Sequence, residues 1–372
     1  MVLRTIAALI MALLPLAAHA QEKYVLGAPT AMTGPYAFVG VSMEKGIRIA
    51  VEEINAAGGV NGTKLDLLLE DTASDRAQTV TLARRMALKD RALAIIGPNT
   101  STDAMAAGPL VMDLKIPMIT NTPSPAVRKI GEWIFTIPEA PSDIMVGLAK
   151  FGIEQLKIKK IAFVSVRDNI LFSEQRTVVR DHMAAAGAQV VADDTISSLD
   201  SDFTALSTKI ASAGVDAISL YMPPEQAANL LLQARQAGLS KDVKLLAPPG
   251  HVSQPYLTTG GKAVEGTYLV ADYHPGTPSE LNRHFVEVFK KRYNTPPDNW
   301  AAVGYNAVQL FKTAALKAAP NVTRESLRGA LSQITNMPSV LGKGKYSIGP
   351  ERAPSYGGII LVVKDGAFVP VN

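Results

Sequence analysis

Short apolar runs alternate with helix-like segments from residue 24 onward, and this alternation limits the chain to one broad class of fold. The predicted strands are 24–30, 64–71, 92–97 and 116–120, and then, after a break, 159–166, 188–194, 215–221 and 243–246. Between them, apolar residues recur at helical spacing. Strands that alternate with helices build parallel sheets with helices on both faces. The sequence therefore predicts an α/β fold.

The alternation stops at 137–143 and then starts again, which indicates two lobes of similar build. Each set of strands and helices is long enough to form its own doubly wound sheet. The C-terminal part adds predicted helices at 279–293, 300–318 and 323–334, and a hairpin-like segment at 358–366. Because ligands bind at the carboxyl ends of strands in such sheets, the loops after the strands are the first place to search for a site.

Residues 1–20 have the composition of a secretory signal peptide. A single Arg4 precedes an apolar run at 6–16, and Ala18-His19-Ala20 supplies a small-x-small cleavage site. The apolar run is shorter than a membrane-spanning helix requires, so a membrane anchor is the weaker alternative. The chain contains no cysteine, which excludes disulfides and lipid attachment to a cysteine. We expect a soluble protein that is exported to the periplasm.

The charge and the motifs exclude several classes of function. The 37 Lys and Arg residues nearly balance 33 Asp and Glu residues and are scattered, so neither nucleic acid nor an anionic membrane is an expected partner. Segments 58–64 and 342–349 are glycine-rich but lack the order of phosphate-binding loops. The five histidines show no metal-ligand spacing. We expect no enzyme activity, metal or cofactor, although a dispersed Ser/His/Asp triad stays open.

Hydroxyl side chains follow two neighbouring predicted strands. Thr100, Ser101 and Thr102 lie where a strand meets a helix, and Thr122 and Ser124 follow the next strand. Unpaired N–H groups at a helix start favour an anion, and hydroxyls add donors. Two such loops together predict a cradle for a carboxylate. The alternative is ordinary helix capping by Ser101 or Thr102.

Several motifs recur in the order found in a known family. The segments "EEINAAGGVNGTKLDLLLEDTASD", "IIGPNTS", "IPMIT", "SDFTAL" and "ARQAGL" make the chain from about residue 24 resemble the leucine/isoleucine/valine-type periplasmic solute-binding proteins. This resemblance implies a monomeric type I receptor of an ABC importer, with a permease and an ATPase as partners and no catalysis. It also implies two lobes joined by a three-strand hinge that closes on one ligand. The expected lobes are 21–140 plus 275–337 and 141–274 plus 338–372.

The resemblance also assigns residues to the ligand site. Ser101 corresponds to the residue whose hydroxyl and N–H hold the α-carboxylate of an amino acid. Thr122 and Ser124 correspond to the second loop, which contacts both the carboxylate and the ammonium group. Tyr36 and Phe38 fall on the loop at the entrance to the cleft.

Four further residues correspond to aromatic positions of the family. Phe172 and Met222 fall where the second lobe usually has tyrosines. Trp300 falls beside the ligand, and Tyr305 matches a tyrosine of the helix that follows. For each of these side chains the alternative is packing in a hydrophobic core.

One loop departs from the family pattern. Amino-acid binders carry an acidic residue after the strand equivalent to 243–246, where it pairs with the ligand's ammonium group. In this sequence that loop reads "LLAPPGH", with Pro249 at the position of the acid. Asp242 precedes the strand and Glu225 belongs to another loop, although Glu225 reaching across would restore the pairing. His251 is expected either to donate to a distal ligand hydroxyl or to lie exposed.

The missing acid changes the expected ligand. An unpaired buried charge costs about 3–5 kcal/mol, which is roughly a 10²–10³-fold loss of affinity for an α-amino acid. A stiff, donor-poor wall suits a carboxylate with an apolar body. We therefore expect an aromatic acid without an α-amino group, such as a hydroxybenzoate or a phenylpropenoate. An amino-acid receptor and a ligand sensor without a transport role are the alternatives.

Overall fold

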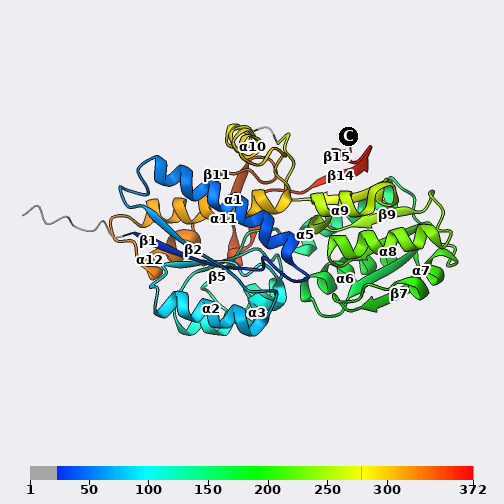
Figure 1. Cartoon of the computed structure of the whole chain (residues 1–372), viewed down its shortest axis with the longest axis horizontal. Coiled ribbons are helices and arrows are strands. Elements are labelled where there is room, and N and C mark those ends of the chain that lie inside the picture. The colour runs from blue at the N-terminus through cyan, green and yellow to red at the C-terminus, as the bar shows by residue number, and fades with distance from the viewer. Residues whose placement is uncertain (1–22, 278, 372) are drawn as a thin grey trace, which may run out of the picture.

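The computed structural model describes residues 23–277 and 279–371, and it forms two α/β lobes side by side (Figure 1). The predicted signal peptide lies outside the described residues. In the described part of the chain, no helix is both long enough and apolar enough to cross a membrane.

The N-terminal lobe is built on a five-stranded parallel sheet with the order β2-β1-β3-β4-β5. Its strands are β1 (Tyr24–Thr30), β2 (Leu65–Asp71), β3 (Ala94–Ile96), β4 (Met118–Thr120) and β5 (Ile134–Thr136). Its helices are α1 (Ala37–Ala56), α2 (Arg76–Leu88), α3 (Ser101–Asp113), α4 (Pro125–Arg128), α10 (Glu280–Tyr293), α11 (Asn299–Ala318) and α12 (Arg324–Leu331). Helices α1 and α11 cover one face of the sheet, and α2 and α3 cover the other (Figure 1).

Two glycines let α1 and α11 approach closely. A Cβ on Gly46 would lie 1.9 Å from the carbonyl oxygen of Ala301, and a Cβ on Gly304 would lie 2.4 Å from that of Met43. Any larger residue would push the helices apart. This contact fixes the N-terminal end of α11, which carries Trp300, against the first lobe.

The C-terminal lobe contains a seven-stranded mixed sheet with the order β15-β14-β10-β9-β8-β6-β7. Its strands are β6 (Lys160–Val166), β7 (Gln189–Ile196), β8 (Ala217–Tyr221), β9 (Lys244–Ala247), β10 (Thr267–Ala271), β14 (Ile359–Lys364) and β15 (Ala367–Pro370). Its helices are α5 (Pro141–Glu154), α6 (Ile170–Ala185), α7 (Thr204–Ala211), α8 (Pro224–Gln236) and α9 (Gln254–Gly260). The five central strands are parallel, and the β14–β15 hairpin adds to β10 in antiparallel fashion.

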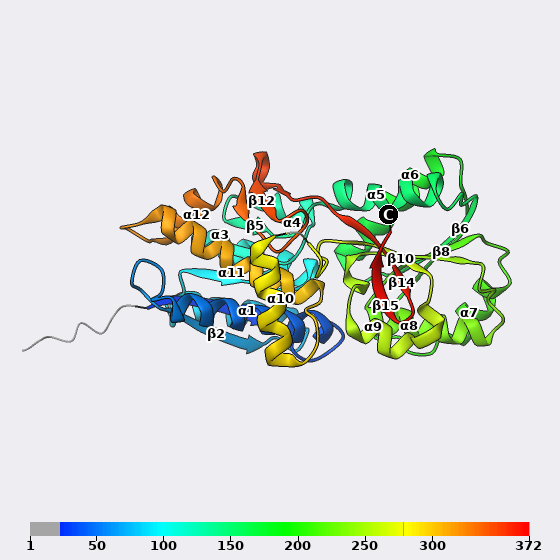
Figure 2. The same ribbon diagram turned by 90° about the horizontal axis from the view of Figure 1, so that it is seen from above.

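Three segments cross between the lobes, which confirms the expected two-lobed fold with a three-strand hinge. The first follows β5 and leads into α5, and the second leaves β10 towards α10. The third, at 356–358, enters β14. Figure 2 shows the long connection before β14 running from one lobe to the other.

The last crossing comes later in the chain than the boundary expected at 338. Strands β11 (Met337–Pro338), β12 (Lys345–Ile348) and β13 (Pro354–Ser355) form a small separate sheet. Its Tyr346 is fully buried in the core of the N-terminal lobe and donates a hydrogen bond to the carbonyl oxygen of Ile137 at 2.9 Å. Residues 338–356 therefore pack with the N-terminal lobe.

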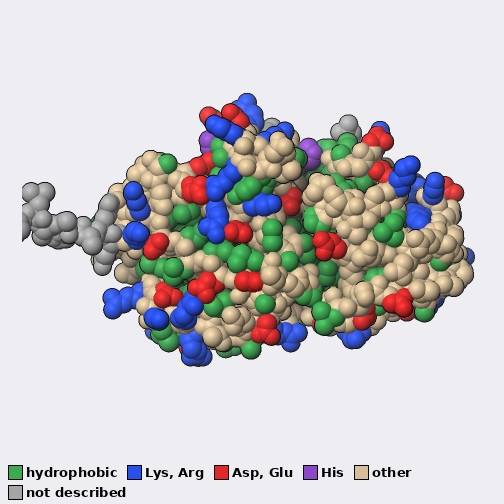
Figure 3. Space-filling model, in the orientation of Figure 1, with side chains coloured by type: hydrophobic (Ala, Val, Ile, Leu, Met, Phe, Trp, Pro, Cys, Tyr) green, Lys and Arg blue, Asp and Glu red, His purple; other side chains and the backbone are tan. Residues whose placement is uncertain are grey.

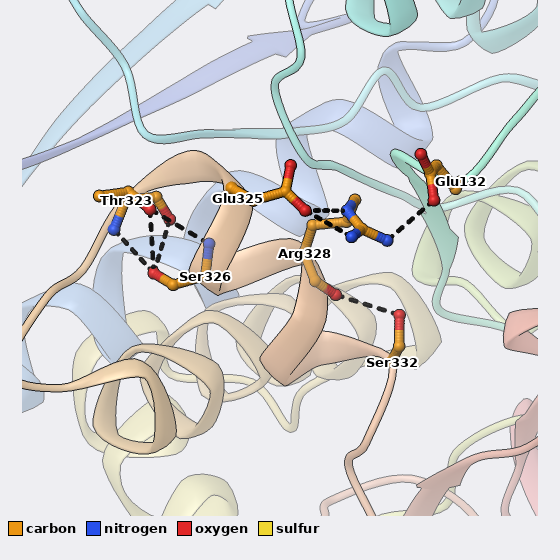
Figure 4. A network of polar contacts seen from close by, with 6 residues as sticks. All are labelled: Glu132, Thr323, Glu325, Ser326, Arg328 and Ser332. Atoms are coloured by element: carbon orange, nitrogen blue, oxygen red, sulfur yellow. Dashed lines mark hydrogen bonds and ion pairs between the residues drawn. The ribbon is translucent and has the colours of Figure 1, made fainter.

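Local interactions fix α12 at the edge of the same lobe (Figure 4). Thr323 and Ser326 form a capping box, in which each side chain accepts a hydrogen bond from the other residue's backbone N–H. Arg328 lies between Glu325 of the same helix and Glu132, to which its Nη1 donates at 2.9 Å.

Three elements differ from the sequence-based expectation. Helix α1 begins at Ala37, so Phe38 lies on a helix rather than on the expected loop. Strand β5 was not expected, and it lies just before the break in the alternation at 137–143. Strand β10 was missed as well, since its five residues follow directly on short helical turns.

Candidate functional site

A cavity lies between the two lobes, at the carboxyl ends of the strands. It is bounded by loops from both lobes and by the crossing segments, and the free space within it is about 30 Å³. The lining residues are Tyr36, Phe38, Val39, Asn99, Thr100, Pro123, Pro138, Glu139, Ile144, Asn169, Leu171, Phe172, Gln175, Pro249, Gly250, Asp272 and Trp300. Its position matches the strand-end location that α/β sheets favour for ligands.

Six of the residues selected from the sequence line this cavity. They are Tyr36, Phe38, Thr100, Phe172, Pro249 and Trp300. The remaining selected residues, which are Ser101, Thr102, Thr122, Ser124, Met222, His251 and Tyr305, are not among its lining residues.

The two hydroxyl loops meet behind one wall of the cavity, which we call the α3 end. Ser101 and Thr122 are fully buried, and their hydroxyls share a short hydrogen bond. Thr100 accepts a hydrogen bond from the N–H of Asp103 at 3.1 Å, so Thr100 is the N-cap of α3 rather than Ser101 or Thr102. Thr100 and Pro123, the chain neighbours of Ser101 and Thr122, line the cavity at this end.

Contacts across the cleft hold the lobes together beside the cavity. The Ser124 hydroxyl, expected to face the ligand, donates to Glu174 Oε1 of α6 at 2.8 Å. Burial raises the pKa of Glu174. The Thr102 hydroxyl donates to the carbonyl oxygen of Asp168 at 3.3 Å. Both contacts join α3-side loops to the C-terminal lobe.

Aromatic rings form much of the remaining surface. The ring of Phe38 lies edge-on to Trp300 with a centroid distance of 6.3 Å, and Tyr36 follows at 6.5 Å from Phe38. Phe172 closes the cavity from α6. Gly250 leaves room for Trp300, because a Cβ at position 250 would lie 3.3 Å from its ring.

Three residues selected from the sequence pack inside the lobes instead. Met222 is fully buried in the core of the C-terminal lobe. His251 is fully buried rather than exposed, lies edge-on to Tyr256 at 5.0 Å, and burial lowers its pKa to about 3. Tyr305 is buried against Phe285. Glu225, which could have replaced the missing acid, is exposed and does not line the cavity.

Two carboxylates missed by the sequence analysis line the part of the wall formed by the crossing segments, which we call the hinge end. Glu139 and Asp272 lie on the first and second crossing segments, and Tyr356 lies on the third. Glu139 Oε1 accepts hydrogen bonds from the N–H groups of Tyr356 at 2.6 Å and Gly357 at 2.7 Å. The Tyr356 hydroxyl accepts from the Glu139 N–H at 2.9 Å and donates to Asp272 Oδ1.

This network connects the hinge segments directly to the cavity. Asp272 is also a hydrogen-bond acceptor for Asn299 Nδ2 at 3.4 Å. Burial, together with the nearby charge of Glu139, raises the pKa of Asp272 to about 6. Sequence periodicity gave no signal for Glu139 or Asp272, because each lies on an irregular segment between the lobes.

Three further polar side chains of the cavity wall also escaped the sequence analysis. Asn99 Oδ1 accepts from the N–H of Ala31 at 2.9 Å, and Asn169 caps α6. Gln175 Oε1 and Trp300 Nε1 are buried without a hydrogen-bond partner among the described residues. Asn99 and Asn169 therefore support the loops, whereas Gln175 and Trp300 have polar groups left for a ligand.

The electrostatic character of the cavity follows from this lining. Among the described lining residues, two are carboxylic acids and none is Lys, Arg or His. Within residues 23–277 and 279–371, no group of His, Cys, Asp and Glu side chains is arranged to hold a metal ion. On the face shown in Figure 3, Lys and Arg side chains are mixed with Asp and Glu side chains. The geometry is that of a binding pocket closed between two lobes.

Comparison with known proteins agrees with this geometry. Residues 23–367 match the model of the family described as periplasmic binding protein. The chain is 26% identical to a Leu/Ile/Val-binding protein of Rhizobium johnstonii, over 93% of both chains.

Two solved structures have the same fold. One is a leucine-binding protein from Thermotoga maritima, with a TM-score of 0.87, 25% identity, and coverage of 94% of this chain and 97% of that one. The other is an ABC-transporter solute-binding protein from Rhodopseudomonas palustris in complex with 3,4-dihydroxybenzoic acid. Its TM-score is 0.85 at 23% identity, with coverage of 94% and 96%.

These relatives are described as binding proteins rather than as enzymes. The match with the family model covers nearly the whole described chain, and the two lobes, the hinge and the cavity between them fit it. The chain therefore belongs to the periplasmic binding protein family, and it has the type I fold of the leucine/isoleucine/valine-type receptors.

Proposed function

We propose that this protein is the periplasmic receptor of an ABC importer and closes on an aromatic acid that lacks an α-amino group. A signal peptide at 1–20 directs its export. The protein then delivers the ligand to the permease, and the ATPase subunits drive its transport. The observation that carries the ligand class is the wall at Pro249 and Gly250. At this position, the amino-acid receptors of the leucine/isoleucine/valine type carry an acidic residue that pairs with the ligand's ammonium group. This cavity has Pro249 there, next to the ring of Trp300.

The rest of the lining supports a flat, mostly apolar ligand. Tyr36, Phe38, Phe172 and Trp300 offer ring surfaces, and aromatic pairs gain stability beyond simple burial. The free space of about 30 Å³ in this structure has room for only a water molecule or two, so the lobes must move apart before such a ligand enters.

The α3 end is the proposed place for the ligand carboxylate. The N-terminus of α3 presents backbone N–H groups and a partial positive charge, which favour an anion. The Ser101 hydroxyl, paired with Thr122 in this structure, can rotate to donate to a carboxylate. Repulsion from Glu139 and Asp272 at the hinge end favours the same orientation.

A branched-chain or other amino acid is the second candidate. The specific observation in its favour is that Glu139 and Asp272 line the cavity, since either could pair with an ammonium group displaced from its usual position. The name of the Rhizobium relative, a Leu/Ile/Val-binding protein, also favours it.

Calorimetric titration of the purified mature protein separates the two candidates. The ligand panel contains benzoate, 4-hydroxybenzoate, 4-hydroxycinnamate, leucine and phenylalanine. We expect heats of binding with the aromatic acids and none with the amino acids. Submicromolar binding of leucine without any response to the aromatic acids would overturn the proposal.

A further inference from the structure

We propose that the Glu139 carboxylate at the hinge end accepts a hydrogen bond from a hydroxyl group on the ligand, at the end remote from its carboxylate. This inference rests on the proposed function, and it narrows the ligand class from aromatic acids to hydroxylated aromatic acids. The site consists of Glu139 with Asp272, Gln175 and Tyr356.

Glu139 is built into the fold as a fixed acceptor. Its side chain is anchored through Oε1, which accepts from two backbone N–H groups of the third crossing segment. Its other oxygen, Oε2, accepts no hydrogen bond from any residue in the described part of the chain. The residue is 7% exposed and lines the cavity, and its Oε2 is therefore the atom that we place against the ligand.

A second acceptor on the cavity wall is buried and unpaired among the described residues. Gln175 of α6 is 3% exposed, and its Oε1 has no hydrogen-bond donor among the described residues. Buried polar atoms normally find a partner, because leaving one unpaired costs about 1–3 kcal/mol. Beside the unpaired donor Trp300 Nε1, the wall thus carries two acceptors that have no donor among the described residues, and these acceptors favour a ligand that brings a hydrogen-bond donor.

The number of remaining acceptors favours a hydroxyl group over an ammonium group. Tyr356 and Asn299 already donate to the two oxygens of Asp272. Of the four carboxylate oxygens at the hinge end, only Glu139 Oε2 has no donor among the described residues. A hydroxyl has one proton to donate, whereas an ammonium group carries three and a full charge.

The experiment measures dissociation constants of the full mature protein for benzoate, 4-hydroxybenzoate and 4-(aminomethyl)benzoate. We expect wild type to bind 4-hydroxybenzoate about tenfold or more tightly than benzoate, as for a hydrogen bond to a charged group. In Glu139→Gln this preference is expected to fall by about tenfold, because the charged acceptor is lost. The amide oxygen of the new side chain can still accept from the Tyr356 and Gly357 N–H groups.

The matched control is Glu174→Gln, which alters another buried carboxylate outside the cavity lining. It is expected to change the affinity for both acids by the same factor. Equal affinities for benzoate and 4-hydroxybenzoate in wild type, or tightest binding of the aminomethyl compound, would overturn this inference while the proposed function stood. Binding of leucine and none of the three acids would overturn the proposed function itself. The comparison of the wild-type dissociation constants for benzoate and 4-hydroxybenzoate tests the inference even if the Glu139→Gln variant does not fold.

Discussion

The two ends of the cavity hold their polar groups in different ways. At the α3 end, the hydroxyls of Ser101 and Thr122 satisfy each other, and Thr100 caps the helix. At the hinge end, backbone N–H groups and Tyr356 hold Glu139 in place, and its Oε2 has no donor within residues 23–277 and 279–371. A hydroxyl can rotate towards a new partner at little cost, whereas the anchored carboxylate cannot.

This difference assigns different tasks to the two ends. The hydroxyls of Ser101 and Thr122 can change hydrogen-bond partners and donate to any carboxylate. The α3 end therefore contributes the same affinity to every ligand of the class. The fixed Glu139 carboxylate can form a hydrogen bond only with a ligand whose donor lies at the matching position. The hinge end therefore contributes selectivity among ligands. Because Glu139 also binds the third crossing segment, a ligand at this end contacts the hinge directly.

The largest expected effect comes from adding a carboxylate to the cavity wall at position 249. In Pro249→Glu, a buried charge without a partner faces an anionic ligand, which costs about 3–5 kcal/mol or roughly a 10²–10³-fold loss of affinity for aromatic acids. Calorimetric titration with benzoate checks this, with Pro249→Ala as the control. Benzoate affinity equal to that of the alanine variant would show that position 249 does not form the ligand wall.

Removal of the Tyr356 hydroxyl tests whether the hinge end is preorganised. Tyr356→Phe leaves Asp272 and the Glu139 N–H short of a partner, and we expect a loss of about 3 kcal/mol in the free energy of unfolding. Urea denaturation without ligand measures it.

Tyr305→Phe is the matched control for this change. The Tyr305 hydroxyl donates at 2.8 Å to Glu53, whose side chain is 27% exposed, so the expected loss is only about 1 kcal/mol. Equal losses in the two variants would contradict a specially built hinge end.

His251 provides a pH test that separates the core from the hinge end. Its native pKa is about 3, below the value of about 6.5 in an unfolded chain, so the unfolded state binds more protons between these values. Stability should therefore fall by about 2 kcal/mol between pH 7 and pH 5. Urea denaturation of wild type and His251→Phe measures this contribution, which the variant should lack. An unchanged pH dependence in the variant would contradict the buried, neutral histidine.

The smallest expected effect comes from the α3 end. Ser101→Ala removes one donor to the ligand carboxylate, so the affinities for benzoate and 4-hydroxybenzoate should both fall about tenfold and their ratio should stay constant. Titration of both acids with the same protein preparation checks this. A change in the ratio would mean that Ser101 reads the ring substituent rather than the carboxylate.

The sequence predicted regular elements better than it predicted the site. The strand at 24–30 matches β1, and the helices at 279–293 and 300–318 match α10 and α11 within one residue, because their apolar spacing is regular. The loops after the strands were identified correctly as the cavity wall, since strand ends converge in any doubly wound sheet.

The hinge end could not be predicted in this way. Glu139 and Asp272 are far apart in the sequence and meet only because two crossing segments pass side by side with Tyr356 between them. The prediction that Met222 and His251 contact the ligand was wrong for a different reason. Each residue follows a strand as expected, but its side chain is buried in the core of the lobe. The position of a residue in the sequence shows which loop it belongs to, but it does not show whether the side chain points into the cavity or into the core.

A crystal structure of the protein with 4-hydroxybenzoate tests the division between the two ends most directly. We predict the ligand carboxylate beside the N-terminus of α3, near Thr100 and Ser101, and its hydroxyl within hydrogen-bond distance of Glu139 Oε2. A ligand bound in the reverse orientation, or with its hydroxyl away from Glu139, would contradict it.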